Sequence, residues 1–161
     1  MKKKIMIGLV AAAIATSAQA GVAEKKAKRA AEEAISQAVE ETKTACGNAE
    51  LKVSVSWDQI ETVAANNAEK MKSKNYESKW LYASIGERTV ATLESLGGIC
   101  KSDADYKEEI AKVNNLVITA KDDFSDYKST YTLDGTIIKA ETGHYMSRSA
   151  SDFTGRLKGL F

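Results

Sequence analysis

One histidine and two cysteines are the side chains of this 161-residue chain whose types could do chemistry. His144 is the first candidate for a general base, because imidazole titrates near neutral pH. A Ser-His-Asp arrangement would also need a marked nucleophile and an orienting acid, and the sequence has no nucleophile-elbow pattern. Serine and carboxylate residues are too numerous to single out partners for His144. We therefore expect a protein that is not an enzyme, and keep a hydrolase using His144 as an alternative.

The two cysteines, Cys46 and Cys100, predict one intrachain disulfide, because the chain begins with an export signal described below. A redox-active pair is the alternative, but redox-active thiols typically have the close CxxC spacing that is missing here. Closing a loop of this size removes unfolded-state entropy equivalent to about 4 kcal/mol in the chain-entropy model. The pair is therefore predicted to be structural.

Sites for metals and cofactors are not marked in the sequence. Residues 122–126 are rich in aspartate but lack the glycine and the final glutamate of an EF-hand loop. His144 and Met146 are suitable donors for copper, yet two ligands do not make a site. Glycine-rich phosphate loops and dinucleotide fingerprints are also missing. We expect no metal and no cofactor.

Residues 1–20 have the pattern of a cleaved secretory signal peptide. Three lysines at positions 2–4 precede an apolar run at 5–15, which is too short to span a bilayer, and Ala18-Gln19-Ala20 is a small-residue cleavage site. Residue 21 is glycine rather than the lipid-modified cysteine of a lipoprotein. The prediction is a periplasmic or secreted bacterial protein, with no transmembrane helix in the mature chain 21–161.

The charge balance of the predicted mature chain argues against a nucleic-acid partner. Cleavage removes three of the 23 basic residues and none of the 22 acidic ones, which leaves a slightly acidic chain. The sequence contains no proline, so no proline-rich linker separates two units. A single helix-rich α+β domain over 21–161 is the simplest interpretation, and the pattern does not indicate an oligomeric state.

Apolar residues at helical spacing predict four main helices and a short last one. The first covers 22–45 and ends at Gly47-Asn48, where both residues tolerate the left-handed conformation. Asp58 is the predicted N-cap of the second, and Gly97-Gly98 the predicted end of the third, over 76–96. Ser102 is expected to cap a fourth helix that continues to Phe124, Asn75 to cap the third, and Ser151 to cap the last.

Alternating apolar residues predict a strand at 51–56, and Asp134-Gly135 predicts a hairpin within 129–140. A two-residue turn at Asp134-Gly135 would pair Leu133 with Thr136. Because an isolated hairpin is marginal in water, we expect the three strands to form one small antiparallel sheet. The predicted fold class is therefore α+β, with about four main helices packed on a three-stranded antiparallel sheet and one disulfide.

Aromatic residues near the predicted sheet suggest a recognition surface. Trp57, Tyr131 and Tyr145, together with His144, would form it if they are exposed, although Trp57 and Tyr131 also fit core positions. The function that these features favour is an exported, non-enzymatic interaction module that binds a protein or another envelope component. A small-ligand-binding periplasmic protein, the His144 hydrolase and an envelope-stress chaperone are the alternatives.

Overall fold

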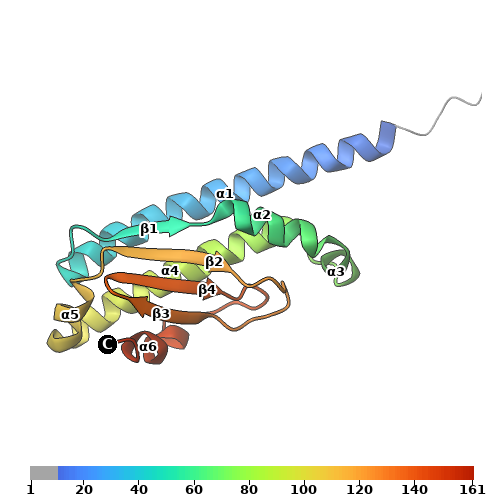
Figure 1. Cartoon of the computed structure of the whole chain (residues 1–161). Helices are drawn as coiled ribbons and strands as arrows, with labels where there is room; N and C mark the ends of the chain where they lie inside the picture. The colour runs from blue at the N-terminus through green and yellow to red at the C-terminus, as the bar shows by residue number, and fades with distance from the viewer. Residues whose placement is uncertain (1–10) are drawn as a thin grey trace, which may run out of the picture.

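The structure is a computed structural model that describes the backbone of residues 11–161 and side chains from residue 21 onward (Figure 1). Residues 1–10 of the predicted signal peptide lie outside the described residues. The described chain has six helices and four strands, in the order α1 Ala11–Cys46, β1 Lys52–Val55, α2 Trp57–Asn66, α3 Ala68–Ser73, α4 Ser78–Ser102, α5 Ala104–Ile110, β2 Asn115–Ala120, β3 Thr130–Asp134, β4 Ile137–Thr142 and α6 Ser151–Lys158. The fold class is α+β, as predicted.

The sheet has four strands in the order β1-β2-β4-β3 and is mixed rather than antiparallel. β2 runs parallel to both of its neighbours, β1 and β4, whereas β3 runs antiparallel to β4. The prediction of three antiparallel strands was therefore wrong. It missed β2, which was assigned to a long fourth helix, and β2 is the strand that joins β1 to the hairpin.

The predicted fourth helix is short because the chain changes from helix to strand after Ile110. Asp103, not Ser102, is its N-cap, and the Asp103 carboxylate accepts hydrogen bonds from the backbone N–H groups of Asp105 and Tyr106. In β2, alternate side chains are buried, so the apolar residues follow a period of two. The same apolar residues also fit the spacing of a helix. The segment forms a strand because it pairs with β1 and β4 in the sheet.

The predicted hairpin is present, but its turn lies one residue later than expected. Leu133 pairs with Ile138 and Asp134 pairs with Ile137, so the two loop residues are Gly135 and Thr136. Gly135 has a φ of +59° at the first loop position. A positive φ at that position is typical of a type II′ turn, which matches the twist of the flanking strands.

Other predicted helix boundaries also shift. α2 begins at Trp57 with Ser56 as its N-cap, so Asp58 lies in the first turn instead of capping it. Asn75 has a φ of +51° before α4 and does not cap it, because Glu77 occupies the N-cap position. Ser151 is the first residue of α6, and Ala150 precedes it as the N-cap.

Helices α1 and α4 pack closely against each other through small residues. A Cβ atom added to Gly86 would lie 2.5 Å from the Cβ atom of Ala31, so the two backbones can approach only because residue 86 is glycine. Gly97 similarly faces Ala45 inside α4, and the helix continues through it to Ser102. The predicted helix end at Gly97-Gly98 was therefore wrong, because α4 continues to Ser102.

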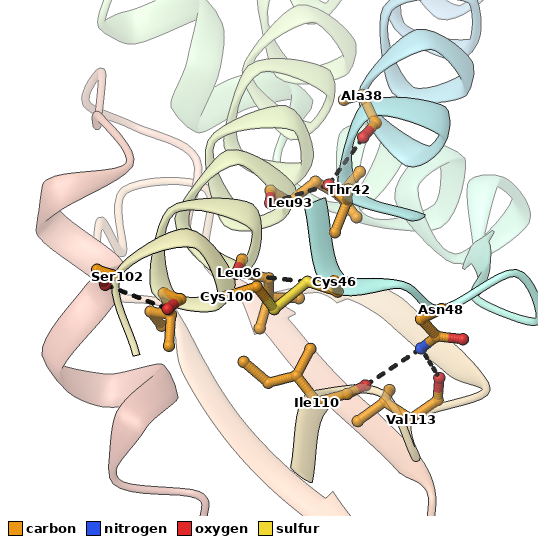
Figure 2. Close-up of a disulfide and its surroundings, with 11 residues drawn as sticks. Ala38, Thr42, Cys46, Asn48, Leu93, Leu96, Cys100, Ser102, Ile110 and Val113 are labelled. Atoms are coloured by element: carbon orange, nitrogen blue, oxygen red, sulfur yellow. Dashed lines mark hydrogen bonds between the residues drawn. A yellow bond between two sulfur atoms is a disulfide. The ribbon is translucent and has the colours of Figure 1, made fainter. Parts of the chain in front are cut away.

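The predicted disulfide between Cys46 and Cys100 is present, with an S–S distance of 2.12 Å (Figure 2). It joins the last residue of α1 to the last turn of α4. Gly47 has a φ of +65° directly after Cys46 and ends α1 in the left-handed conformation. Near the bridge, the Thr42 hydroxyl donates to Leu93 O at 3.0 Å, and Asn48 Nδ2 donates to Val113 O at 2.6 Å.

The two faces of the sheet differ. Leu116, Ile118 and Ala140 point into the core that also contains Leu93 of α4, and Figure 1 shows α4 crossing behind the strands. Strand residues of the opposite face are exposed or half-buried and are largely polar. The helices therefore form a layer on one face, and α1 lies beside β1 at one edge of the sheet.

Candidate functional site

A trough runs along one side of α1 and is formed by two adjoining pockets of about 920 Å³ and 530 Å³. The α1 residues that line it recur at three- and four-residue intervals, so one face of the helix forms the whole wall. These residues are Gly21, Glu24, Lys25, Lys28, Glu32, Ile35, Ser36, Val39, Glu40 and Lys43.

The two pockets meet at Trp57. Its ring stacks on Tyr82 with the centroids 6.1 Å apart, and Lys28 Nζ lies 5.6 Å from its centroid. Tyr82 and Lys28 line the larger pocket, whereas Trp57 lines the smaller one. A ligand that extends along α1 would therefore cross the Trp57 side chain.

The walls opposite α1 differ between the two pockets. In the larger pocket the wall comes from α2, α3 and the start of α4, and includes Ala64, Met71 and Tyr76. In the smaller pocket it is formed by residues 51–55, which include all of β1. The smaller pocket is thus a groove between a helix and the edge strand of a sheet.

The outer edge of β1 faces away from its neighbour β2. The backbone N–H groups of Lys52 and Ser56 donate to Asn114 O and Ile118 O, at 3.0 and 2.9 Å. Because alternate residues of a strand present their backbone groups to opposite sides, the N–H and C=O groups of Val53 and Val55 point to the free edge. Neither amide donates a hydrogen bond to another of the described residues. A row of unpaired backbone groups therefore lies along the groove.

Charges of both signs line the trough. Three glutamates and three lysines line the larger pocket, and two glutamates and two lysines line the smaller one. Burial raises the pKa of the Tyr76 and Tyr82 hydroxyl groups to about 12, so both remain neutral hydrogen-bonding groups at physiological pH. The Ser78 hydroxyl donates to the Glu24 carboxylate and links α1 to the start of α4. The trough offers apolar contact, hydrogen bonds and balanced charge.

The four residues predicted to form a recognition surface do not form one patch. Trp57 lies in the trough. Tyr145 is 39% exposed and lies behind the larger pocket, with its ring centroid 6.1 Å from that of Tyr76. Tyr131 lies on β3, where its hydroxyl is 2.8 Å from Thr92 Oγ1 and its ring packs against Phe153.

His144, the fourth of these residues, is buried and only 1% exposed. Its Nδ1 is 3.3 Å from Thr142 O, and its Nε2 has no hydrogen-bond partner among the described residues. Burial lowers the pKa of its imidazole to about 4, and the positive charge of Arg88 acts in the same direction. His144 is therefore not part of an exposed recognition surface. Its ring contacts no hydroxyl or carboxylate in the described structure.

Sequence reasoning missed most of the trough. The repeat of lining residues along α1 was visible as a helical period, but nothing local marked that face as uncovered. The free groups of Val53 and Val55 follow from the strand order, which places β1 at an edge. That order depends on recognising β2 as a strand. The alternation of apolar residues in 115–120 was therefore the signal that could have identified β2 and so located the groove.

Comparisons of the chain with protein-family models, with curated proteins and with solved structures found no match. Within residues 11–161, no helix is both long and apolar enough to cross a membrane. The described side chains also include no group of three or more His, Cys, Asp or Glu residues placed to hold a metal ion.

Proposed function

We propose that this protein is an exported, non-enzymatic interaction module that binds an extended segment of another polypeptide in the trough. The segment pairs with the free edge of β1 and contacts α1 on its other side. The observation that carries this proposal is the set of unpaired backbone groups of Val53 and Val55 beside the smaller pocket. Addition of a strand to an exposed sheet edge is a common way for a domain to bind a peptide.

The chemistry of the trough supports a polypeptide ligand. Balanced charges suit a peptide that carries both signs and do not favour a polyanion such as nucleic acid. Val53, Val55 and Trp57 are half-buried lining residues of the smaller pocket and provide apolar contact for the bound strand. Trp57 provides a large aromatic surface where the two pockets meet.

The unpaired edge of β1 is a further reason to expect a binding partner. Unpaired strand edges promote unwanted association, and proteins usually blunt them with charges or cover them. Lys52 at the start of β1 is exposed and provides one such charge, and α1 limits approach from one side. A strand that enters the groove would satisfy the edge within a defined channel.

The test removes one outward-facing hydrogen-bond donor. The oxidised protein is used to select binders from a library of displayed linear peptides, and one selected peptide is then measured against two variants. Val53→Pro removes the N–H group on the free edge, a position where edge strands tolerate proline. Val53→Thr keeps the N–H group and is the matched control. We expect wild type and Val53→Thr to bind alike and Val53→Pro to bind about tenfold or more weakly.

Circular dichroism and an intact disulfide would establish that both variants are folded. Equal binding by Val53→Pro and Val53→Thr would reject strand pairing at β1. A library that yields no peptide, or peptides whose binding survives Trp57→Ala together with Val53→Pro, would reject the trough as the binding site.

A further inference from the structure

A separate, smaller pocket lies at the opposite edge of the sheet, where the residues before β3 meet α6. Its volume is about 110 Å³. It is lined by Tyr127, Lys128, Arg148, Asp152, Phe153 and Arg156. Three of these six residues are cationic and one is acidic; we call this site the basic pocket.

The cations of the basic pocket have no carboxylate partner. Lys128, Arg148 and Arg156 form no ion pair within the part of the chain that the structure describes. The carboxylate of Asp152 instead accepts hydrogen bonds from the N–H and hydroxyl groups of Ser149, at 2.8 and 3.1 Å. These hydrogen bonds lower the pKa of Asp152, with a smaller contribution from the two arginines.

The three cations make other contacts at the pocket. Arg156 Nη1 donates to Ser129 O at 2.7 Å, which leaves the rest of its guanidinium group available. The Arg148 guanidinium lies 5.2 Å from the ring centroid of Tyr127, and Lys128 Nζ lies 5.9 Å from the same centroid. Two of the three cations therefore lie within cation–π distance of one tyrosine at the pocket.

A fourth cation lies beneath the pocket. Arg88 is 1% exposed, and its Nη1 donates to Tyr127 O at 2.8 Å, while its Nη2 donates to Met146 O. Its Nε has no hydrogen-bond partner among the described residues. Burial lowers the pKa of Arg88 to about 10, and Arg148 acts in the same direction, but the side chain stays charged at neutral pH. No carboxylate within the described residues neutralises this buried charge by an ion pair.

We infer that the basic pocket binds a phosphate group, either free or as the ester group of a larger molecule. Arg148 and Arg156 have planar guanidinium groups that match the oxygen geometry of phosphate, and Lys128 adds a third positive charge. The buried charge of Arg88 raises the electrostatic potential at the pocket floor. A doubly charged oxyanion would relieve the mutual repulsion of these cations, and the pocket volume fits a group of that size. This inference does not depend on the trough.

The test is a titration of the oxidised, isotope-labelled protein with inorganic phosphate, followed by NMR. We expect saturable chemical-shift changes confined to residues 127–129 and 148–156. Arg148→Gln together with Arg156→Gln should weaken binding about tenfold to a hundredfold, because each arginine provides charge-assisted hydrogen bonds. Lys26→Gln together with Arg29→Gln removes the same charge from exposed positions on α1 and is the matched control.

A second arm separates the possible sources of the phosphate group. Vesicles of phosphatidylglycerol in phosphatidylcholine, compared with phosphatidylcholine alone, test a lipid headgroup. Vesicle binding that the Arg148/Arg156 variant loses and the control retains would support a headgroup phosphate. Localised binding of inorganic phosphate without vesicle binding would support a soluble phosphate ester. The inference is overturned if neither probe binds, if chloride competes as well as phosphate does, or if the control variant loses binding equally.

Discussion

The α1 trough and the basic pocket lie at opposite edges of one sheet and are built in different ways. The trough wall is a helix held by apolar contact, by close approach of Gly86 to Ala31, and by the disulfide. The basic pocket is held by polar groups, with Arg88 and His144 buried beneath loops that follow β2 and β4. The trough edge therefore depends on a disulfide and on apolar packing. The other edge depends on a buried charged guanidinium, Arg88, and on a buried neutral imidazole, His144.

Because of this difference, we expect different perturbations to destabilise the two edges. Apolar contacts and a disulfide do not titrate near physiological pH, so the packing of α1 on α4 should be insensitive to mild acid. The buried imidazole of His144 is neutral and gains a proton in acid, whereas the Arg88 guanidinium is already charged. The loops around His144, which include residues next to the basic pocket, should therefore respond to acid first. The predictions below test whether the two edges are separable in this way.

Removal of the disulfide should have the largest effect. We expect Cys46→Ala together with Cys100→Ala to lower the free energy of unfolding by about 4 kcal/mol, because the unfolded chain regains loop entropy. Urea denaturation measures the loss. Hydrogen exchange should rise more in α1 and β1 than in residues 143–150, and phosphate binding should survive under conditions where the variant is folded. A uniform rise in exchange would show that the two edges are coupled.

Acid should act next most strongly, and on the other edge. The folded-state pKa of His144 is lowered from 6.5 to about 4, so the unfolded chain binds this proton more readily than the folded one. Its contribution to stability is complete above pH 6.5 and is lost as the pH falls from 6.5 toward 4. The loss amounts to about 3 kcal/mol. Denaturation of wild type and His144→Gln across this range measures it.

The difference between these two proteins isolates His144 from nearby groups such as Asp123, whose pKa is also lowered, in its case by hydrogen bonds from Lys70 and Ser125. If wild type and His144→Gln lose stability in parallel between pH 6.5 and 4, the buried imidazole does not cause the acid response.

The contact between Gly86 and Ala31 should give a smaller effect. Gly86→Ala places a methyl group 2.5 Å from the Ala31 Cβ, so the helices must separate, which costs about 2 kcal/mol. Gly98→Ala is the matched control, because this exposed position in α4 has no atom within 4 Å of an added Cβ. It should stabilise the protein by about 0.5–1 kcal/mol through helix propensity. Thermal or urea denaturation measures the stability of both variants. Equal changes in stability would show that the Gly86–Ala31 contact does not limit the approach of the helices.

Local chemistry made the disulfide and the hairpin predictable. Cys46 precedes a glycine suited to ending a helix, and Asp134-Gly135 is a strong turn signal even though the turn begins one residue later. The strand β2 was not predictable in the same way, because Leu116, Ile118 and Ala120 fit a period of two while Val117, Ala120 and Phe124 fit a helical period. Its parallel partner β1 is distant in the sequence, and a local pattern of residues does not indicate a distant partner.

The sites were harder to predict than the elements. Trp57 was a candidate because it is an aromatic residue beside the predicted sheet, and it lies in the trough. Nothing in the sequence marked Arg88 as buried, because an arginine in a helix is usually exposed and its hydrogen-bond acceptors come from distant loops. His144 was misjudged for the same reason: the carbonyl of Thr142 and the surrounding packing make burial of a neutral imidazole acceptable.

The position of the disulfide has a consequence for the speed of folding. β1 and β2 are neighbours in the sheet although α2 to α5 separate them along the chain, and non-local pairings of this kind slow folding because a long loop must close first. Cys46 precedes β1 by a few residues, and Cys100 stands shortly before α5 and β2. Once the bridge forms, the two strands become near neighbours along the covalent path. The oxidised chain should therefore reach its native topology faster than the reduced chain. The timing of oxidation would then set how long unpaired strands remain exposed to aggregation.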